Sequence, residues 1–235
     1  WATHGMVTDQ NAHPFLSDDG KIAVVHNGII ENFQPLRAAL IKDGVEFQSE
    51  TDSEVIPNLV SKYYKGNLLS AVQEALKKVV GTYALAITCI DEPNKIVVAK
   101  RGGPLVVGLS DGVYYIASDA NAIVGNTTRV IYLEDGDIVE VTPQGLKFPN
   151  IEGNDYSERI EECSIDASET EKCGYDTYME KEINEQPESI ERAFAGRIDF
   201  EASTAKLSGY DDDIFKRTNK ITAMSAGTSW YASLF

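Results

Sequence analysis

The stretch Val-Val-His-Asn-Gly-Ile-Ile, residues 24–30, decides how this sequence is interpreted. Apolar residues flank a central Asn27-Gly28 pair. Asn and Gly both tolerate positive φ, so the pair fits a tight type I′ turn and predicts a β-hairpin. The same pair could instead present two hydrogen-bond donors, the Asn27 amide and the Gly28 N–H, to a developing oxyanion. An isolated Asn-Gly pair is far more often only a turn, and the neighbouring stretches must decide.

Helical patterns follow this stretch. Asn32 is placed to cap a helix that runs to about Lys42. Thr51 and Glu54 have the spacing of a capping box that opens a second helix, although Pro57 conflicts with the interior of that helix. A third helix is predicted over residues 67–80, where apolar residues recur at helical spacing.

The period then changes to that of β-strands. Short turn sequences rich in Gly, Pro and Asp separate the predicted strands, which indicates antiparallel pairing. A set of helices followed by a block of hairpins is typical of the α+β class. The predicted strands cover residues 83–90, 95–101, 105–109, 113–117, 129–133 and 138–141.

The last third of the chain differs in composition. Residues 150–177 are acidic and poor in aliphatic side chains, as in an interdomain linker. Residues 179–196 favour a helix that Pro187 interrupts. A strand predicted over Ile221–Met224 runs into Gly227-Thr228-Ser229. Such a junction can cradle a phosphate at a helix N-terminus, but a simple strand-to-helix turn is the more common use of the pattern.

Composition narrows the classes of partner. The chain has 235 residues, 43% hydrophobic and 25% charged, with a formal net charge of −16. This charge disfavours nucleic acid and anionic membrane surfaces, because both need clustered Lys and Arg. No segment has the length of a membrane span or the pattern of a signal peptide.

The three cysteines show neither disulfide nor zinc-site spacing. Cys89 lies in an apolar run and is predicted to be buried. Cys163 and Cys173 lie in a polar segment without a nearby His or basic cluster that would lower their pKa. We expect all three to be non-catalytic and the protein to reside in a reducing cytoplasm. Because the chain opens at Trp1 without Met and stops soon after Ser229, we also expect it to be an internal piece of a longer protein.

Five short motifs follow one another along the chain. They are Trp-Ala-Thr-His-Gly at 1–5, Asn-Ala-His-Pro at 11–14, His-Asn-Gly-Ile-Ile-Glu-Asn at 26–32, Glu-Thr-Asp-Ser-Glu at 50–54 and Ile-Ala-Ser-Asp at 116–119. Together they resemble class II glutamine amidotransferase domains of the N-terminal-nucleophile hydrolase superfamily. Tyr-Met-Glu-Lys-Glu-Ile-Asn-Glu-Gln-Pro at 178–187, followed by Gly227-Thr228-Ser229, is similar to the glutamine–fructose-6-phosphate aminotransferase family.

The resemblance implies a domain layout. Residues 1–149 would form a four-layer αββα glutaminase domain that lacks its N-terminal part. Residues 150–177 would be the acidic linker. Residues 178–235 would hold an interdomain helix and the start of an αβα sugar-isomerase domain.

The resemblance also assigns roles. The Asn27 side chain and the Gly28 N–H would form the oxyanion hole. Asp52, with help from the Gly28 carbonyl, would hold the α-amino group of glutamine. The remaining assignments are Thr3 and His4 for the glutamine carboxylate, Trp1 for the loop that closes the pocket, and Thr228 and Ser229 for the sugar phosphate.

Glutamine and fructose 6-phosphate would be the small-molecule partners, and a homodimer is expected by analogy. No redox or metal cofactor is implied. The spacing of His4, His13 and His26 matches no standard metal site, and His26 is better explained as a buried structural residue. From the sequence alone, Asp52 is better explained as a first-turn helix residue stabilised by the helix dipole, and only the family resemblance favours the glutamine-binding role.

The departure from the family concerns the nucleophile. The family uses an N-terminal cysteine whose α-amine serves as the base, whereas residue 1 here is Trp. We therefore expect this chain alone to be inactive, while the longer protein releases ammonia from glutamine and makes glucosamine 6-phosphate. Two alternatives stay open. One is another class II enzyme, such as an amidophosphoribosyltransferase or asparagine synthetase, and the other is a non-catalytic module that kept the fold.

Overall fold

A computed structural model describes residues 5–163, 172, 174–194, 198–199, 204–205, 217–224, 230–231 and 234. The chain divides into two compact units, Trp1–Glu171 and Lys172–Phe235. Each unit is described by itself.

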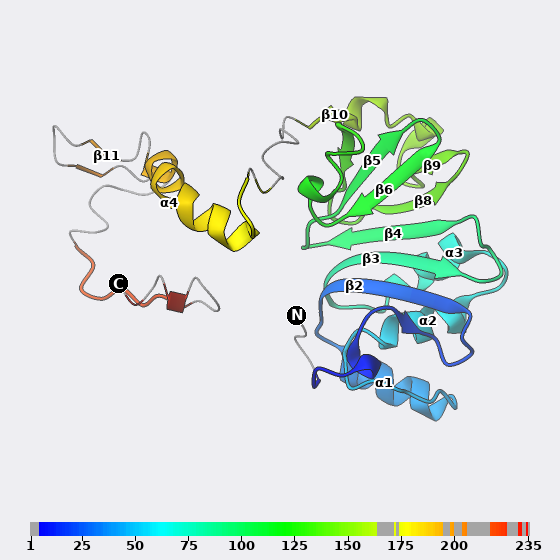
Figure 1. Cartoon of the computed structure of the whole chain (residues 1–235). Helices are drawn as coiled ribbons and strands as arrows, with labels where there is room; N and C mark the ends of the chain where they lie inside the picture. The colour runs from blue at the N-terminus through cyan, green and yellow to red at the C-terminus, as the bar shows by residue number, and fades with distance from the viewer. Residues whose placement is uncertain are drawn as a thin grey trace. The chain divides into compact units, whose positions relative to one another are not determined.

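A six-stranded antiparallel sheet forms the centre of the first unit (Figure 1). The order of its strands is β1-β2-β3-β4-β8-β9. β2 and β3 pair along nine residues, the longest pairing in the sheet. The strands are β1 (Phe15–Leu16), β2 (Ile22–Ile30), β3 (Gly81–Cys89), β4 (Ile96–Arg101), β8 (Ile138–Thr142) and β9 (Gly145–Lys147).

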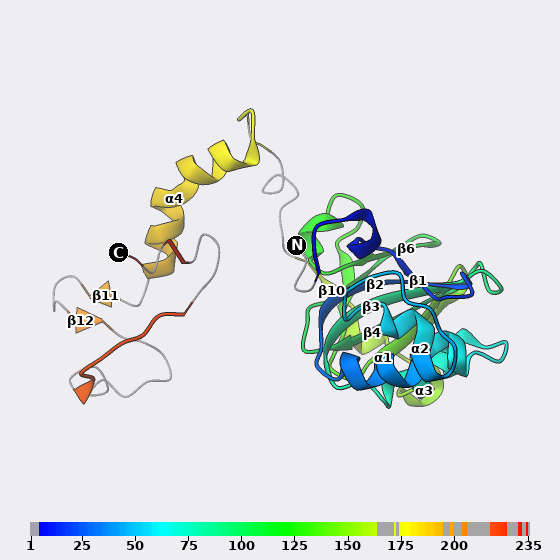
Figure 2. The ribbon, with the colours of Figure 1, turned by 90° about the horizontal axis from the view of Figure 1, so that it is seen from below.

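Three helices cover one face of this sheet, α1 (Phe33–Lys42), α2 (Val55–Tyr63) and α3 (Leu68–Leu76) (Figures 1 and 2). Apolar side chains from the helices and from alternate strand positions share one core, in which Val24, Leu85 and Ile56 are among the fully buried residues. Alternation along each strand sends every second side chain into this core.

The other face of the sheet packs on a second, four-stranded sheet with the order β10-β7-β5-β6. Val98 and Val139 of the first sheet meet Val107 and Ile131 of the second. In the described part of the chain, the outer face of the second sheet is covered by the short 3-10 helix η2 (Ala120–Ala122). The strands are β5 (Val106–Ser110), β6 (Val113–Ala117), β7 (Arg129–Tyr132) and β10 (Glu161–Glu162). The α+β class predicted from the sequence is confirmed.

The predicted hairpin at Asn27-Gly28 is wrong. Both residues lie inside β2, where Asn27 pairs with Ala84 and Gly28 with Tyr83. Gly28 has φ +138°, and a Cβ there would overlap the carbonyl oxygen of Thr82. The glycine is therefore required by the close approach of β3 and not by a turn.

Two predicted helix caps are also wrong. The Asn32 side chain precedes α1 but binds the segment before β3, donating to the Lys78 carbonyl and accepting from the Val80 N–H. Glu54 does not close a capping box on Thr51, because its carboxylate accepts the N–H groups of Gln48 and Ser49 at 2.7 and 2.6 Å. α2 begins at Val55, so Pro57 falls in the first turn, where a missing N–H is tolerated.

Residues 148–163 pack on the first unit, although we expected the linker to begin at residue 150. The Arg159 guanidinium binds the buried Asp137 carboxylate at 2.7 Å and lies over the ring of Phe148. Burial raises the pKa of Asp137, but the Arg159 pairing and further hydrogen bonds outweigh it and hold this pKa below its usual value. Apolar side chains of Ile160 and Cys163 anchor the same segment. Two 3-10 turns lie within it, η3 (Glu152–Asn154) and η4 (Ser157–Arg159).

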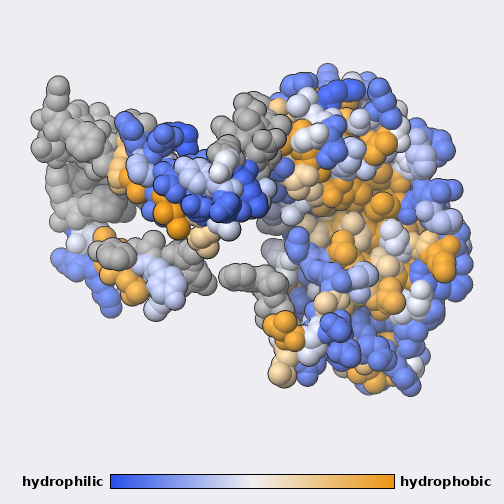
Figure 3. All heavy atoms as spheres, in the orientation of Figure 1, coloured by the Kyte–Doolittle hydropathy of each residue, from blue (hydrophilic) through white to orange (hydrophobic). Residues whose placement is uncertain are grey.

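The second unit contains the helix α4 (Tyr178–Phe194), which continues through Pro187. Its surface is mostly hydrophilic, with apolar side chains such as Ile183 and Phe194 exposed along it (Figure 3). Two short strands, β11 (Ile198–Asp199) and β12 (Thr204–Ala205), pair with each other. The strand predicted over Ile221–Met224 is absent, and these two end residues are 75% and 91% exposed, so they have no sheet to join in the described part of the chain.

Among the described residues, no helix combines the length and the apolarity that crossing a bilayer requires.

Candidate glutamine site

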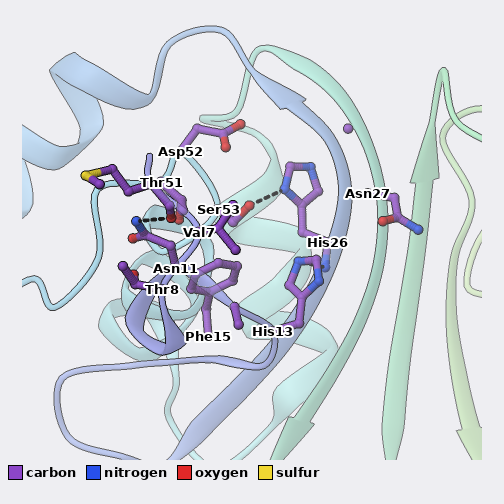
Figure 4. Close-up of a pocket in the computed structure, with 13 residues that line it drawn as sticks. Val7, Thr8, Asn11, His13, Phe15, His26, Asn27, Thr51, Asp52 and Ser53 are labelled. Carbon is purple, nitrogen blue, oxygen red and sulfur yellow. Dashed lines mark hydrogen bonds between the residues drawn. The ribbon is translucent and has the colours of Figure 1, made fainter. Parts of the chain in front are cut away.

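A pocket of about 400 Å³ lies where three segments of the first unit meet (Figure 4). These segments are the loop that leads into β1, the middle of β2, and the turn that precedes α2. The lining residues are Met6, Val7, Thr8, Asn11, Ala12, His13, Phe15, His26, Asn27, Gly28, Thr51, Asp52 and Ser53. The pocket lining thus includes Asn27, Gly28 and Asp52, which the family resemblance assigns to one site.

Asp52 is the buried acid of this pocket, with 2% of its surface exposed. Its Oδ2 accepts the N–H of Ile30 in β2 at 2.7 Å. Asp52 lies before the first residue of α2, so it is not a first-turn helix residue. The hydrogen bond instead joins the turn of residues 50–53 directly to the strand that carries Asn27 and Gly28.

His26 and His13 form a second link between the same segments. The Nδ1 of His26 lies 2.8 Å from the Ser53 hydroxyl, and the His26 N–H donates to the Nε2 of His13 at 3.2 Å. Burial lowers the pKa of both imidazoles, and the nearby Asp52 carboxylate offsets only part of the effect on His26. His26 is 4% exposed, as expected of a structural histidine.

The Asn27 side chain lies on the opposite face of β2 from the His26 side chain. Neighbouring residues of a strand project to opposite sides, and Figure 4 shows the Asn27 side chain on the far side of β2 from His26 and Ser53. The backbone of Asn27 and Gly28 therefore borders the pocket, while the Asn27 amide is directed away from Asp52.

The other predicted site residues cannot be placed. Trp1, Thr3, His4, Thr228 and Ser229 lie outside the described residues. Of the cysteines, Cys89 and Cys163 are free and buried, and neither lines the pocket. Cys173 also lies outside the described residues. No group of three or more potential metal ligands occurs in the part of the chain that the structure describes.

Several residues that line the pocket have no role in the prediction from sequence, among them Asn11, His13 and Ser53. Asn11 and His13 belong to the family motif at residues 11–14, and Ser53 directly follows Asp52. Their contribution depends on how the loop before β1 crosses the turn at residues 50–53. Local periodicity carries no information about such a crossing.

Comparison with known proteins identifies the family of this chain. The family model described as the glutamine amidotransferase domain matches residues 3–125. The chain is 42% identical to the glutamine–fructose-6-phosphate aminotransferase (isomerizing) of Chlorobaculum tepidum over 240 residues, and 43% identical to that of Clostridium acetobutylicum. Each alignment covers 100% of this chain and 39% of the relative. The chain thus spans about 39% of the length of these relatives.

Solved structures agree with the sequence comparison. The glutamine phosphoribosylpyrophosphate amidotransferase from B. subtilis, complexed with ADP and GMP, matches with a TM-score of 0.52 and 27% identity, over 61% of this chain and 32% of that chain. An allosteric regulatory enzyme of purine biosynthesis matches with a TM-score of 0.51 and 29% identity, over 59% of this chain and 31% of that chain. This chain therefore belongs to the class II glutamine amidotransferase family and has its N-terminal-nucleophile hydrolase fold.

Proposed function

We propose that the pocket at Asp52 binds glutamine and that the full-length protein carrying this chain transfers ammonia from glutamine to fructose 6-phosphate, giving glutamate and glucosamine 6-phosphate. The observation that carries this proposal is the buried Asp52 carboxylate facing the Gly28 segment of β2 in one pocket. The names of the relatives supply the second substrate.

Asp52 suits the α-ammonium group of an amino acid. A buried ammonium is costly unless a charged partner compensates it. Ile30 holds one oxygen of the Asp52 carboxylate, so the group keeps a fixed orientation toward a ligand. A carboxylate fixed in this way selects a positively charged group and places the rest of the ligand along the pocket.

Gly28 suits the role of an oxyanion donor. The N–H groups of His26 and Ile30 point to the same edge of β2, where His13 and Asp52 accept them. Because N–H directions alternate along an extended strand, we expect the Gly28 N–H on that edge between the two. The role of the Asn27 amide as a second donor rests on the family resemblance.

The nucleophile is proposed to come from outside the residues described here, since neither Cys89 nor Cys163 lines the pocket. We therefore propose that this 235-residue chain binds glutamine without hydrolysing it. On the family resemblance, Trp1, Thr3 and His4 would complete the glutamine site, and Thr228 and Ser229 would begin the sugar-phosphate site of a sugar-isomerase domain. A homodimer and a cytoplasmic location remain predictions on the same basis.

The test measures products. The full-length protein, given glutamine and fructose 6-phosphate, should release glutamate and form glucosamine 6-phosphate. The 235-residue chain should bind glutamine in a calorimetric titration and release no glutamate. Replacement of fructose 6-phosphate by phosphoribosyl pyrophosphate tests the alternative of a phosphoribosyl-transferring relative. Absence of glutamate from the full-length protein would leave the non-catalytic module as the better explanation.

A further inference from the structure

The side chain of Asn11 joins two walls of the pocket. Its Oδ1 accepts the N–H of Glu50 at 3.0 Å, and its Nδ2 donates to the carbonyl of Met6 at 2.9 Å. A dashed line at Asn11 in Figure 4 marks the second of these bonds. One amide therefore bridges the loop before β1 and the turn that carries Asp52.

Two further contacts tighten this bridge. The N–H of Met6 donates to the Glu50 carboxylate at 3.4 Å. Gly5 has φ +78°, and a Cβ on it would lie 2.6 Å from the Asn11 Nδ2. The backbone at Gly5 thus passes directly over the Asn11 amide, and the positive φ at this position favours glycine.

The contacts of Asn11 join two segments that both line the pocket, so they bear on ligand binding. Met6 follows residues 1–4 almost directly, and Glu50 stands two residues before Asp52. Met6, Asn11 and Asp52 all line the pocket. The Asn11 amide, which belongs to the loop before β1, therefore sets the spacing between the Met6 wall and the Asp52 carboxylate.

We propose that Asn11 is a positioning residue for glutamine, one that fixes the width of the pocket opposite Asp52 without touching the reacting atoms. The inference rests on the function proposed above. The bridge needs one acceptor and one donor on the same planar group, which an amide supplies. A carboxylate at this position would keep the bond from the Glu50 N–H but would face the Met6 carbonyl with a second acceptor.

The test uses the full-length protein with Asn11→Ala and Asn11→Asp. Loss of two hydrogen bonds should raise the KM for glutamine about tenfold in Asn11→Ala, with kcat within about twofold of wild type. Asn11→Asp should raise the same KM to a similar extent. The matched control is Gln10→Ala, an exposed residue of the same 3-10 helix outside the pocket, which should leave KM unchanged.

The outcomes separate this inference from the proposed function. A wild-type protein that neither binds nor hydrolyses glutamine overturns both. A wild-type protein that turns over glutamine, with both Asn11 variants within about twofold of its KM, overturns only the positioning role. A fall in kcat at unchanged KM also contradicts it. If Asn11→Ala does not fold, Asn11→Asp together with Glu50→Ala, which removes only the bond from Met6, decides the question by the same KM measurement.

Discussion

Two residue pairs in this molecule share the same local chemistry and adopt different structures. Asp111-Gly112 forms the two-residue turn between β5 and β6, where Ser110 pairs with Val113. Asn27-Gly28 continues straight through β2. Both glycines have positive φ, +73° at Gly112 and +138° at Gly28.

The difference lies in what surrounds each pair. No atom lies within 4 Å of a Cβ built on Gly112, whereas the same atom on Gly28 would overlap the Thr82 carbonyl. β2 has partners on both edges, β1 and β3, and the nine-residue pairing with β3 extends past Gly28 to Ile30. A pair that can turn does not turn when a neighbouring strand continues beside it. At Gly28 the missing side chain lets another backbone approach, and at Gly112 it permits a tight turn.

The largest test of this contrast is Gly28→Ala against Gly112→Ala. We expect Gly28→Ala to lower the free energy of unfolding by about 3 kcal/mol or more, because β3 must move away from β2. Gly112→Ala meets only the backbone cost of positive φ, about 1–2 kcal/mol. Urea unfolding of both variants measures the difference. Equal losses would show that the Thr82 backbone yields easily and that the contrast is only conformational.

A second test compares Asp52, which lines the same pocket as Asn27-Gly28, with Asp111, which is part of the other pair. Asp52→Asn should weaken glutamine binding at least tenfold, or about 1.4 kcal/mol. The substitution removes the negative charge that would pair with the ammonium group of glutamine, while the hydrogen bond from the Ile30 N–H can persist. Asp111→Asn, in the exposed turn, should leave binding unchanged. Calorimetric titration with glutamine gives both values. Equal affinity in wild type and Asp52→Asn would remove Asp52 from the site.

The smallest expected effect concerns pH. Burial lowers the pKa of His26 below the ordinary 6.5 in the folded protein, so the unfolded chain takes up a proton first as the pH falls. Stability conferred by neutral His26 is complete above pH 6.5 and declines as pH falls through the interval below it. The slope contributed by this histidine is at most about 1.4 kcal/mol per pH unit.

Thermal unfolding from pH 7.5 down to pH 5.5 measures this decline, and His26→Gln should reduce its slope. The β5–β6 hairpin, residues 106–117, has no histidine and contributes nothing to this slope. An identical pH profile in His26→Gln would show that protonation of His26 does not destabilise β2.

Sequence patterns were most informative where neighbouring strands follow each other along the chain. The predicted strand over 113–117 matches β6, and that over 138–141 matches β8 to within one residue. Short turns specify the β5–β6 and β8–β9 pairings locally. The pairing of β2 with β3 spans three helices, so no local signal showed that the strand continues through Asn27-Gly28, and turn chemistry prevailed in the prediction.

The residues of the candidate site also fall into those that could be predicted and those that could not. Asn27, Gly28 and Asp52 were predicted through a family resemblance, and the pocket brings all three to its lining. The first-turn helix position considered for Asp52 was wrong because Asp52 precedes α2, and its carboxylate binds Ile30, a residue 22 positions away in the chain. The roles of Asn11 and His13 depend likewise on backbone groups of distant segments, and residue type alone does not specify those contacts.

The pairing of Arg159 with Asp137 bears on how this protein can be divided for engineering. A shortened protein that ends at residue 149 would keep the Asp137 carboxylate, whose side chain is 1% exposed, and lose the cation bound to it. Removal of one partner of a buried ion pair costs about 3–5 kcal/mol, comparable to much of the stability of a small domain. A shortened protein that ends at residue 163 keeps the pair and strand β10, and we expect this shorter version to fold.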